Sequence, residues 1–273
     1  MTAPIQPNAI AWQPLTPRGI SAFAFAPLGR LWLVQLVVAM FAAGVIIWFI
    51  NRNWYPVIAS AITELPDQGQ LHNGKLEWDG DEPTVLADSP YLSIAVDLEH
   101  AGDARTPADL QAEFGERDLK FFSLLGFCHL NYSRDSDIGF NHPDLEPWWG
   151  AWNPMLLAIT ALLSIAALFI NWAILATLYF LPAWLGAFFA NRDLTLAGSW
   201  RLSGAALMPA ALFFTFAIIL YGLGTINLVS LGMANALHFI LGWLFLVLAV
   251  RSLPLHPDST GKPNPFTDAE KSP

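Results

Sequence analysis

Charged residues are missing from three long stretches of this chain. Asp, Glu, Lys and Arg are all absent from Leu31–Ile50, from Trp148–Asn191 and from Leu202–Val250. A helix needs about 20 apolar residues to cross the hydrocarbon core of a bilayer, which is about 30 Å thick. These stretches therefore predict an integral membrane protein that crosses the lipid bilayer several times.

The charge that the chain does carry is concentrated in one segment. Residues 51–150 hold 18 Asp and Glu against 6 Lys and Arg, whereas the rest of the chain has a small positive excess. We interpret this segment as a separate polar domain between spans. Its negative charge would repel phosphate groups, which excludes nucleic acid as a partner. The single cysteine, Cys128, rules out an intramolecular disulfide and is expected to be buried.

The predicted fold is an all-α membrane bundle of four transmembrane helices with a small inserted α+β extracytoplasmic domain. In chain order, the predicted parts are an N-terminal cytoplasmic tail (1–30), a first span (31–50), the acidic domain (51–150), a bundle (151–250, with spans near 154–181, 203–221 and 228–250) and a disordered cytoplasmic tail (251–273). The run from Trp152 to Ala190 leaves an alternative open. We favour one long span followed by an interfacial piece kinked at Pro182, but a tight hairpin turning at Asn171 would make it two spans.

Arginines next to the spans predict the orientation of the chain. Lys and Arg are enriched on the cytoplasmic side of membrane proteins. With four spans, the flanking arginines lie on one side, namely Arg18, Arg30, Arg192, Arg201 and Arg251. This places both termini in the cytoplasm and the acidic domain outside the cell membrane. A fifth span would move Arg192 and Arg201 to the side opposite Arg30.

The acidic domain shows short strand-like segments. Tyr91–Leu98 alternates apolar and more polar residues, the period of a half-buried strand. Strands are predicted at 74–78, 84–87, 91–98 and 119–125. Thr106–Asp109 predicts the start of a short helix, because Thr can cap it and Pro suits its first position. Leu110 and Phe114 then fall four residues apart, and the stretch from 126 to Pro147 is predicted to be a loop.

Several segments together resemble a known family. They are Trp54–Pro66, Asn73–Glu77, a strand ending at Val96-Asp97, and the connector Arg192–Leu202, which leads into a span containing Pro209. This order is similar to that of a bacterial family of uncharacterised membrane proteins related to the Yip superfamily. The resemblance implies an N-terminal span, an exported domain and a closing bundle in a bacterial inner membrane. Eukaryotic relatives of the superfamily act in vesicle trafficking by binding proteins, which hints at partner recruitment.

A dense polar cluster occupies residues 131–146. Its carboxylates and imidazole, from Asp135, Asp137, His142 and Asp144, are ligand types for a divalent cation. The spacing does not fit an EF-hand, because Phe140 falls at the sixth place, which requires Gly. A solvated loop explains the same residues, so no metal or other cofactor is predicted.

Four polar side chains lie inside the predicted spans: Gln35, Asn171, Asn235 and His238. Polar residues in hydrocarbon are costly and are often functional. A path for ions would need acidic partners in other spans, and the charge-free stretches contain none. Packing between helices, within one chain or with a second copy, is therefore the favoured interpretation.

Three hypotheses about function stay open. The leading one is a non-enzymatic anchor or scaffold, without catalytic residues, whose exported domain binds a protein partner or a ligand. The alternative is a transporter or channel for a neutral or lipid-like solute, with a path lined by the four polar side chains. A membrane-embedded enzyme that combines the acidic cluster with His129 or His142 is the least favoured.

Overall fold

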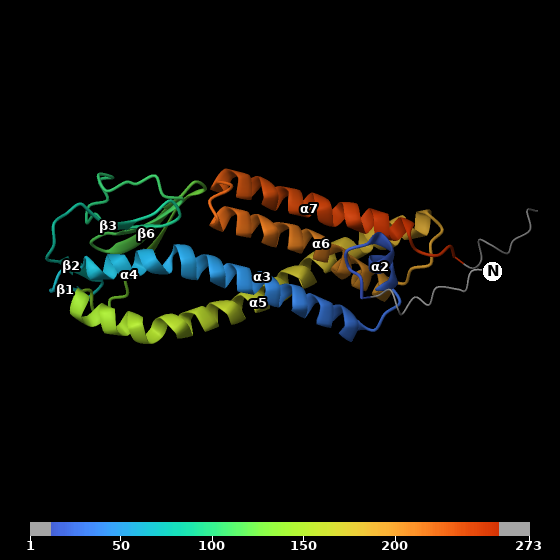
Figure 1. Cartoon of the computed structure of the whole chain (residues 1–273), viewed down its shortest axis with the longest axis horizontal. Helices are drawn as coiled ribbons and strands as arrows, with labels where there is room; N and C mark the ends of the chain where they lie inside the picture. Colours follow the sequence, from blue (N-terminus) through green and yellow to red (C-terminus); the bar gives the residue numbers. More distant parts are fainter. Residues whose placement is uncertain (1–11, 257–273) are drawn as a thin grey trace, which may run out of the picture. The chain divides into compact units, whose positions relative to one another are not determined.

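The computed structural model describes residues 12–256, which belong to two compact units. Of the described residues, unit 1 combines 12–45 with 163–256, and unit 2 comprises 46–162. In chain order the elements are α2 (Pro17–Ala22), α3 (Leu28–Asn53), α4 (Tyr55–Thr63), β1 (Gly69–His72), β2 (Lys75–Trp78), β3 (Thr84–Asp88), β4 (Ser93–Val96), β5 (Leu110–Phe114), β6 (Asp118–Ser123), β7 (Gly126–Asn131), β8 (Asp137–Gly139), α5 (His142–Phe189), α6 (Leu196–Gly222) and α7 (Leu228–Arg251) (Figure 1).

Within residues 12–256, four helical segments are long and apolar enough to cross a membrane. They are Leu28–Thr63, which combines α3 and α4, and the helices α5, α6 and α7. The remaining regular structure is the short helix α2 and a small domain of short strands. The prediction of a mostly helical chain with four long apolar helices and a small strand-containing domain is confirmed.

Helix α5 is continuous over 48 residues and differs from the prediction at both ends. It passes Asn171 and Pro182 without interruption, so neither the hairpin at Asn171 nor a separate piece after Pro182 is found. It also begins before the predicted loop ends, because the Asn141 side chain caps it: Asn141 Oδ1 accepts a hydrogen bond from Asp144 N at 2.9 Å.

Small residues let the helices of unit 1 approach one another closely. Helix α6 runs beside α7 (Figure 1), and its Gly204 lies against α3. A Cβ atom at Gly204 would come within 3.1 Å of Leu31 and 3.3 Å of Gln35. Helix α2 lies in the segment predicted as the N-terminal tail, and its Ile20 is buried in the same core together with Phe23, which follows the helix. Contacts of this kind are typical of helix packing in membranes.

The connector between α5 and α6 lies at the same end of unit 1 as the end of α7. Arg192 Nη1 donates to the carbonyl of Leu253 at 2.7 Å, two residues beyond Arg251. Arg201, in the first turns of α6, donates to the carbonyl of Ala24 at 2.7 Å. The structure therefore gathers arginines from three segments at one end of this unit.

Unit 2 contains two sheets. The smaller has the order β2-β1-β8 and is antiparallel, with Leu71 opposite both Leu76 and Ile138. The larger has the order β3-β4-β5-β6-β7, in which only the β4–β5 pair is parallel. One face of the larger sheet packs with α4 on an apolar core that includes Ile62, Leu65 and Val96.

The predicted helix after Thr106 is wrong, because Leu110–Phe114 forms strand β5. Its residues pair with β4 on one side and β6 on the other. Thr106 does not cap a helix. Its backbone N donates to Gln111 Oε1 at 3.0 Å, which holds the loop before β5 against that strand. Pairing with two neighbours outweighs the local helix signal here. Strands β1, β7 and β8 were not predicted, and the last two lie in the predicted loop.

Candidate functional site

Strands β6 and β7 form a tight antiparallel hairpin in the larger sheet. The register is uninterrupted from Asp118 opposite Asn131 to Ser123 opposite Gly126. Gly126 has φ of 121°, a conformation that favours glycine, and Ser123 Oγ accepts a hydrogen bond from Leu125 N at 3.3 Å. The turn is thus fixed by its own backbone and places Leu124 and Leu125 at the tip.

The hairpin exposes apolar side chains. Leu125 is 96% exposed, Phe127 66%, Leu124 64% and Leu130 63%. All six residues of β7 are exposed, and Cys128, expected to be buried, is among them. We call Leu124, Leu125, Phe127 and Leu130 the hairpin surface. Exposed apolar groups that cluster in this way mark an interaction site more often than scattered ones do.

The two edges of the larger sheet are built differently. At the β3 edge, Pro83 precedes the strand, Asp88 ends it and the register with β4 shifts between Val85 and Ala87. Proline, charge and irregular pairing are the means by which proteins protect an edge from adding another strand. Strand β7 has none of them: it contains no Pro, Asp, Glu, Lys or Arg, and its pairing with β6 is regular.

A buried polar network holds the other strand of the hairpin to the sheet. The His100 ring lies between two carboxylates, with Nδ1 2.6 Å from Glu113 Oε1 and Nε2 2.9 Å from Asp118 Oδ1. Glu113 is fully buried, and its Oε2 also accepts from Gln111 Nε2 at 3.1 Å. Because Glu113 lies on β5 and Asp118 on β6, the ring ties neighbouring strands to the loop between β4 and β5.

The same loop covers one face of the hairpin. Arg105 lies with its guanidinium carbon 3.2 Å from the centroid of the Phe122 ring, and its Nε is 3.4 Å from Glu113 Oε2. A cation over an aromatic face is attractive. The Arg105 contact therefore covers Phe122, whereas Phe127, its partner on β7, stays exposed.

Asp97 shapes the start of this loop. Its carboxylate accepts hydrogen bonds from Ala101 N at 3.1 Å and Gly102 N at 2.9 Å. Burial by itself would raise the pKa of Asp97, but these backbone donors and the nearby His100 outweigh it, so the pKa is lowered. Tyr132 donates to the carbonyl of Gly115 at 3.2 Å, and burial together with the charge of Asp118 raises the pKa of its hydroxyl.

The residues proposed as weak metal ligands have separate partners. Asp137 lies 3.4 Å from His72, and Asp144 accepts from Asn141 Nδ2 at 2.9 Å. His142 faces Glu146 at 3.3 Å, and Asp135 is exposed. Within residues 12–256, no group of three or more His, Cys, Asp and Glu side chains could hold a metal ion. His129, named for the enzyme hypothesis, is exposed on β7.

Two of the four polar side chains of the predicted spans are buried and two are exposed. Gln35 is buried beside Gly204, and His238 is buried with its ring next to those of Phe214 and Phe239. Asn171 and Asn235 are exposed on the outside of α5 and α7.

Comparison with known proteins identified no relative of this chain. The chain matches no family model, no curated protein and no solved structure. The resemblance to the Yip-related family therefore stays a prediction from the sequence.

The hairpin surface was missed in the sequence, although a signal for it exists. Residues 121–133 contain no Asp, Glu, Lys or Arg, within a domain that is otherwise strongly acidic. A stretch without charged residues is also the evidence by which the apolar helices were predicted. The His100 network has no comparable signal, because its members are distant in the chain and meet only through strand pairing.

Proposed function

We propose that this protein is a non-enzymatic membrane anchor whose α+β domain binds an extended polypeptide along strand β7. The four apolar helices would cross a bacterial inner membrane, with both termini in the cytoplasm and the domain outside. The observation that carries the proposal is the unprotected β7 edge with its apolar side chains.

The membrane part of the proposal rests on where apolar and basic groups lie. Leu163, Ile170 and Leu178 of α5 are exposed, as expected for a helix that contacts lipid. The arginines at one end of unit 1 fit the cytoplasmic side, where Lys and Arg are enriched. With four spans, the acidic domain would lie on the side of the membrane opposite these arginines.

The binding part of the proposal uses the backbone of β7 as well as its side chains. An added strand pairs its main chain with an open sheet edge, and pockets or faces for alternate side chains supply specificity. On β7, Phe127 and Leu130 lie on opposite faces of the sheet, so a partner strand would meet one apolar side chain on each face. The uncharged strand also imposes no repulsion on an acidic partner.

Photo-crosslinking in the full-length chain tests this proposal. A photoreactive amino acid at Leu130, on the β7 edge, should give a defined crosslinked product in intact cells. The same group at Val85, which is exposed on the protected β3 edge, should give none. The product at Leu130 should disappear when Phe127→Lys is added. A dimer-sized product would identify the partner as a second copy, and equal crosslinking at both edges would refute the β7 site.

A further inference from the structure

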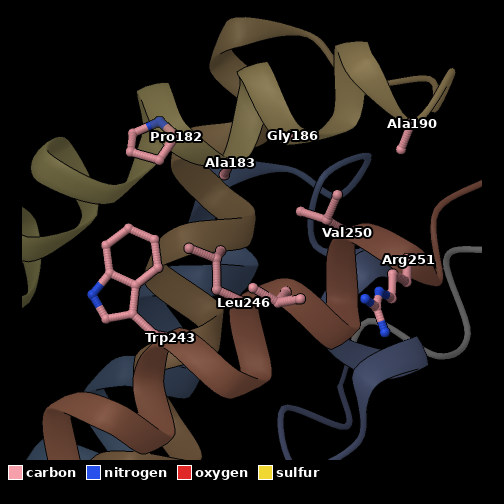
Figure 2. A pocket seen from close by; sticks show the side chains of 9 residues that line it. Pro182, Ala183, Gly186, Ala190, Trp243, Leu246, Val250 and Arg251 are labelled. Carbon is pink, nitrogen blue, oxygen red and sulfur yellow. The ribbon is translucent and has the colours of Figure 1, made fainter.

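The helices of unit 1 form an apolar groove with a positively charged end. It has a volume of about 190 Å³ and lies between α5 and the last turns of α7. Figure 2 shows Ala183, Gly186 and Ala190 along one side, with Leu246 and Val250 opposite them. Pro182, Trp243 and Val247 also line the groove, and Arg251 is its only charged lining residue among those described.

Trp243 and Arg251 lie at the two ends of the groove (Figure 2). The Trp243 ring packs on Tyr179 with a centroid separation of 4.4 Å. Arg251 lies at the other end (Figure 2), eight residues further along α7. At 1.5 Å per residue this is about 12 Å along the helix axis, so the groove is elongated and parallel to the direction in which a lipid chain runs.

Donors for an anion are available at the charged end. Arg251 is exposed and makes no ion pair within residues 12–256. Arg251 is the cation that lines this end of the groove, and its guanidinium group suits a phosphate, which accepts charge-assisted hydrogen bonds.

From this combination we infer that the groove binds one anionic phospholipid, with an acyl chain between α5 and α7 and its phosphate at Arg251. The inference depends on the membrane insertion proposed above but not on the β7 edge. A plain lipid annulus would not explain an elongated apolar groove that ends at a cation. Arg251 would also stabilise the end of α7, where cations offset the helix dipole, and the experiment separates that role from lipid binding.

Native mass spectrometry of the full-length chain from detergent micelles tests the inference. Phosphatidylglycerol should bind more tightly than phosphatidylcholine with the same acyl chains. Arg251→Gln should weaken phosphatidylglycerol binding about tenfold, the loss expected for one charge-assisted hydrogen bond, and remove the preference. Arg18→Gln removes the same charge from exposed Arg18, outside the groove, and should change neither affinity.

A second variant tests the apolar part of the groove. A Cβ atom at Gly186 would meet nothing within 4 Å, so Gly186→Leu should fill the groove without disturbing the fold and should weaken binding of both lipids. Gly232 is equally open on another part of α7, and Gly232→Leu should leave both affinities unchanged. Equal affinity for the two lipids, or no effect of Gly186→Leu, would overturn the inference. A chain that stays soluble without detergent would instead refute membrane insertion itself.

Discussion

Replacing Glu113 with alanine tests whether the His100 network holds the larger sheet together. The Glu113 side chain is fully buried, and its carboxylate faces His100 at 2.6 Å, Gln111 at 3.1 Å and Arg105 at 3.4 Å. Alanine removes the acceptor and leaves buried donors unpaired. Removing one partner of a buried ion pair costs about 3–5 kcal/mol. We expect the lower end, about 3 kcal/mol, because Arg105 is partly exposed and water can replace its contact.

Hydrogen exchange of the full-length chain in detergent micelles measures this loss locally. Each 1.4 kcal/mol corresponds to a factor of ten, so the protected amides of β5 and β6 should exchange about a hundredfold faster in Glu113→Ala. Glu116→Ala is the matched control. A hydrogen bond from Lys75 at 2.8 Å lowers the pKa of Glu116, but both side chains are exposed and water screens the pair.

The two variants separate a buried network from surface charge. Glu116→Ala should leave exchange in β5 and β6 nearly unchanged. If Glu113→Ala accelerates exchange no more than Glu116→Ala does, then His100 and its carboxylates do not stabilise the sheet. The packing of the loop from 97 to 109 against the strands would then have to come from its apolar contacts alone.

Three further results are expected. The pKa of Asp97 is lowered from its ordinary value of 3.8 in the folded domain, so its contribution to stability is present above that value and is lost as the pH falls through the folded pKa. In denaturant titrations, Asp97→Asn should therefore destabilise the domain at about pH 6, and its difference from the unsubstituted chain should shrink as the pH falls through the folded pKa. Gly204→Val should destabilise unit 1 by about 1–3 kcal/mol in unfolding measurements in detergent, whereas Gly44→Val should not, because a Cβ at Gly44 meets nothing within 4 Å. A membrane-impermeant maleimide should label native Cys128 in spheroplasts but should reach Ser252→Cys only after permeabilisation; labelling of both from outside would contradict the proposed topology.

The long apolar helices were predictable because their signal is local. A stretch such as Leu202–Val250 excludes charge at every position, and no tertiary contact is needed to read it. The end of α5 was harder, because Pro182 suggests a break in water-soluble proteins. Prolines are tolerated in apolar helices when neighbouring groups satisfy the freed backbone, and α5 continues to Phe189.

The strands were only partly predictable from alternation. The sequence of β4 alternates and its position was predicted, but the strand is not half-buried as expected, because Ser93, Ala95 and Val96 are all buried. All of β7 is exposed, so burial imposes no alternation on it. Strand β5 carries a helix-like spacing of Leu110 and Phe114, and its pairing partners decide its conformation. The site is least predictable, because strand pairing brings His100, Glu113 and Asp118 together.

The smaller sheet cannot be completed during synthesis until its last strand, β8, has been made. Strand β1 needs β8 as its second neighbour, and His72 pairs with Asp137, which is 65 residues later. At about 5–20 residues per second a ribosome takes roughly 3–13 seconds to make that interval. Until then β1 has only β2 beside it. Because β8 ends three residues before α5 begins, the sheet closes as the next apolar helix emerges, which couples domain folding in time to delivery of α5.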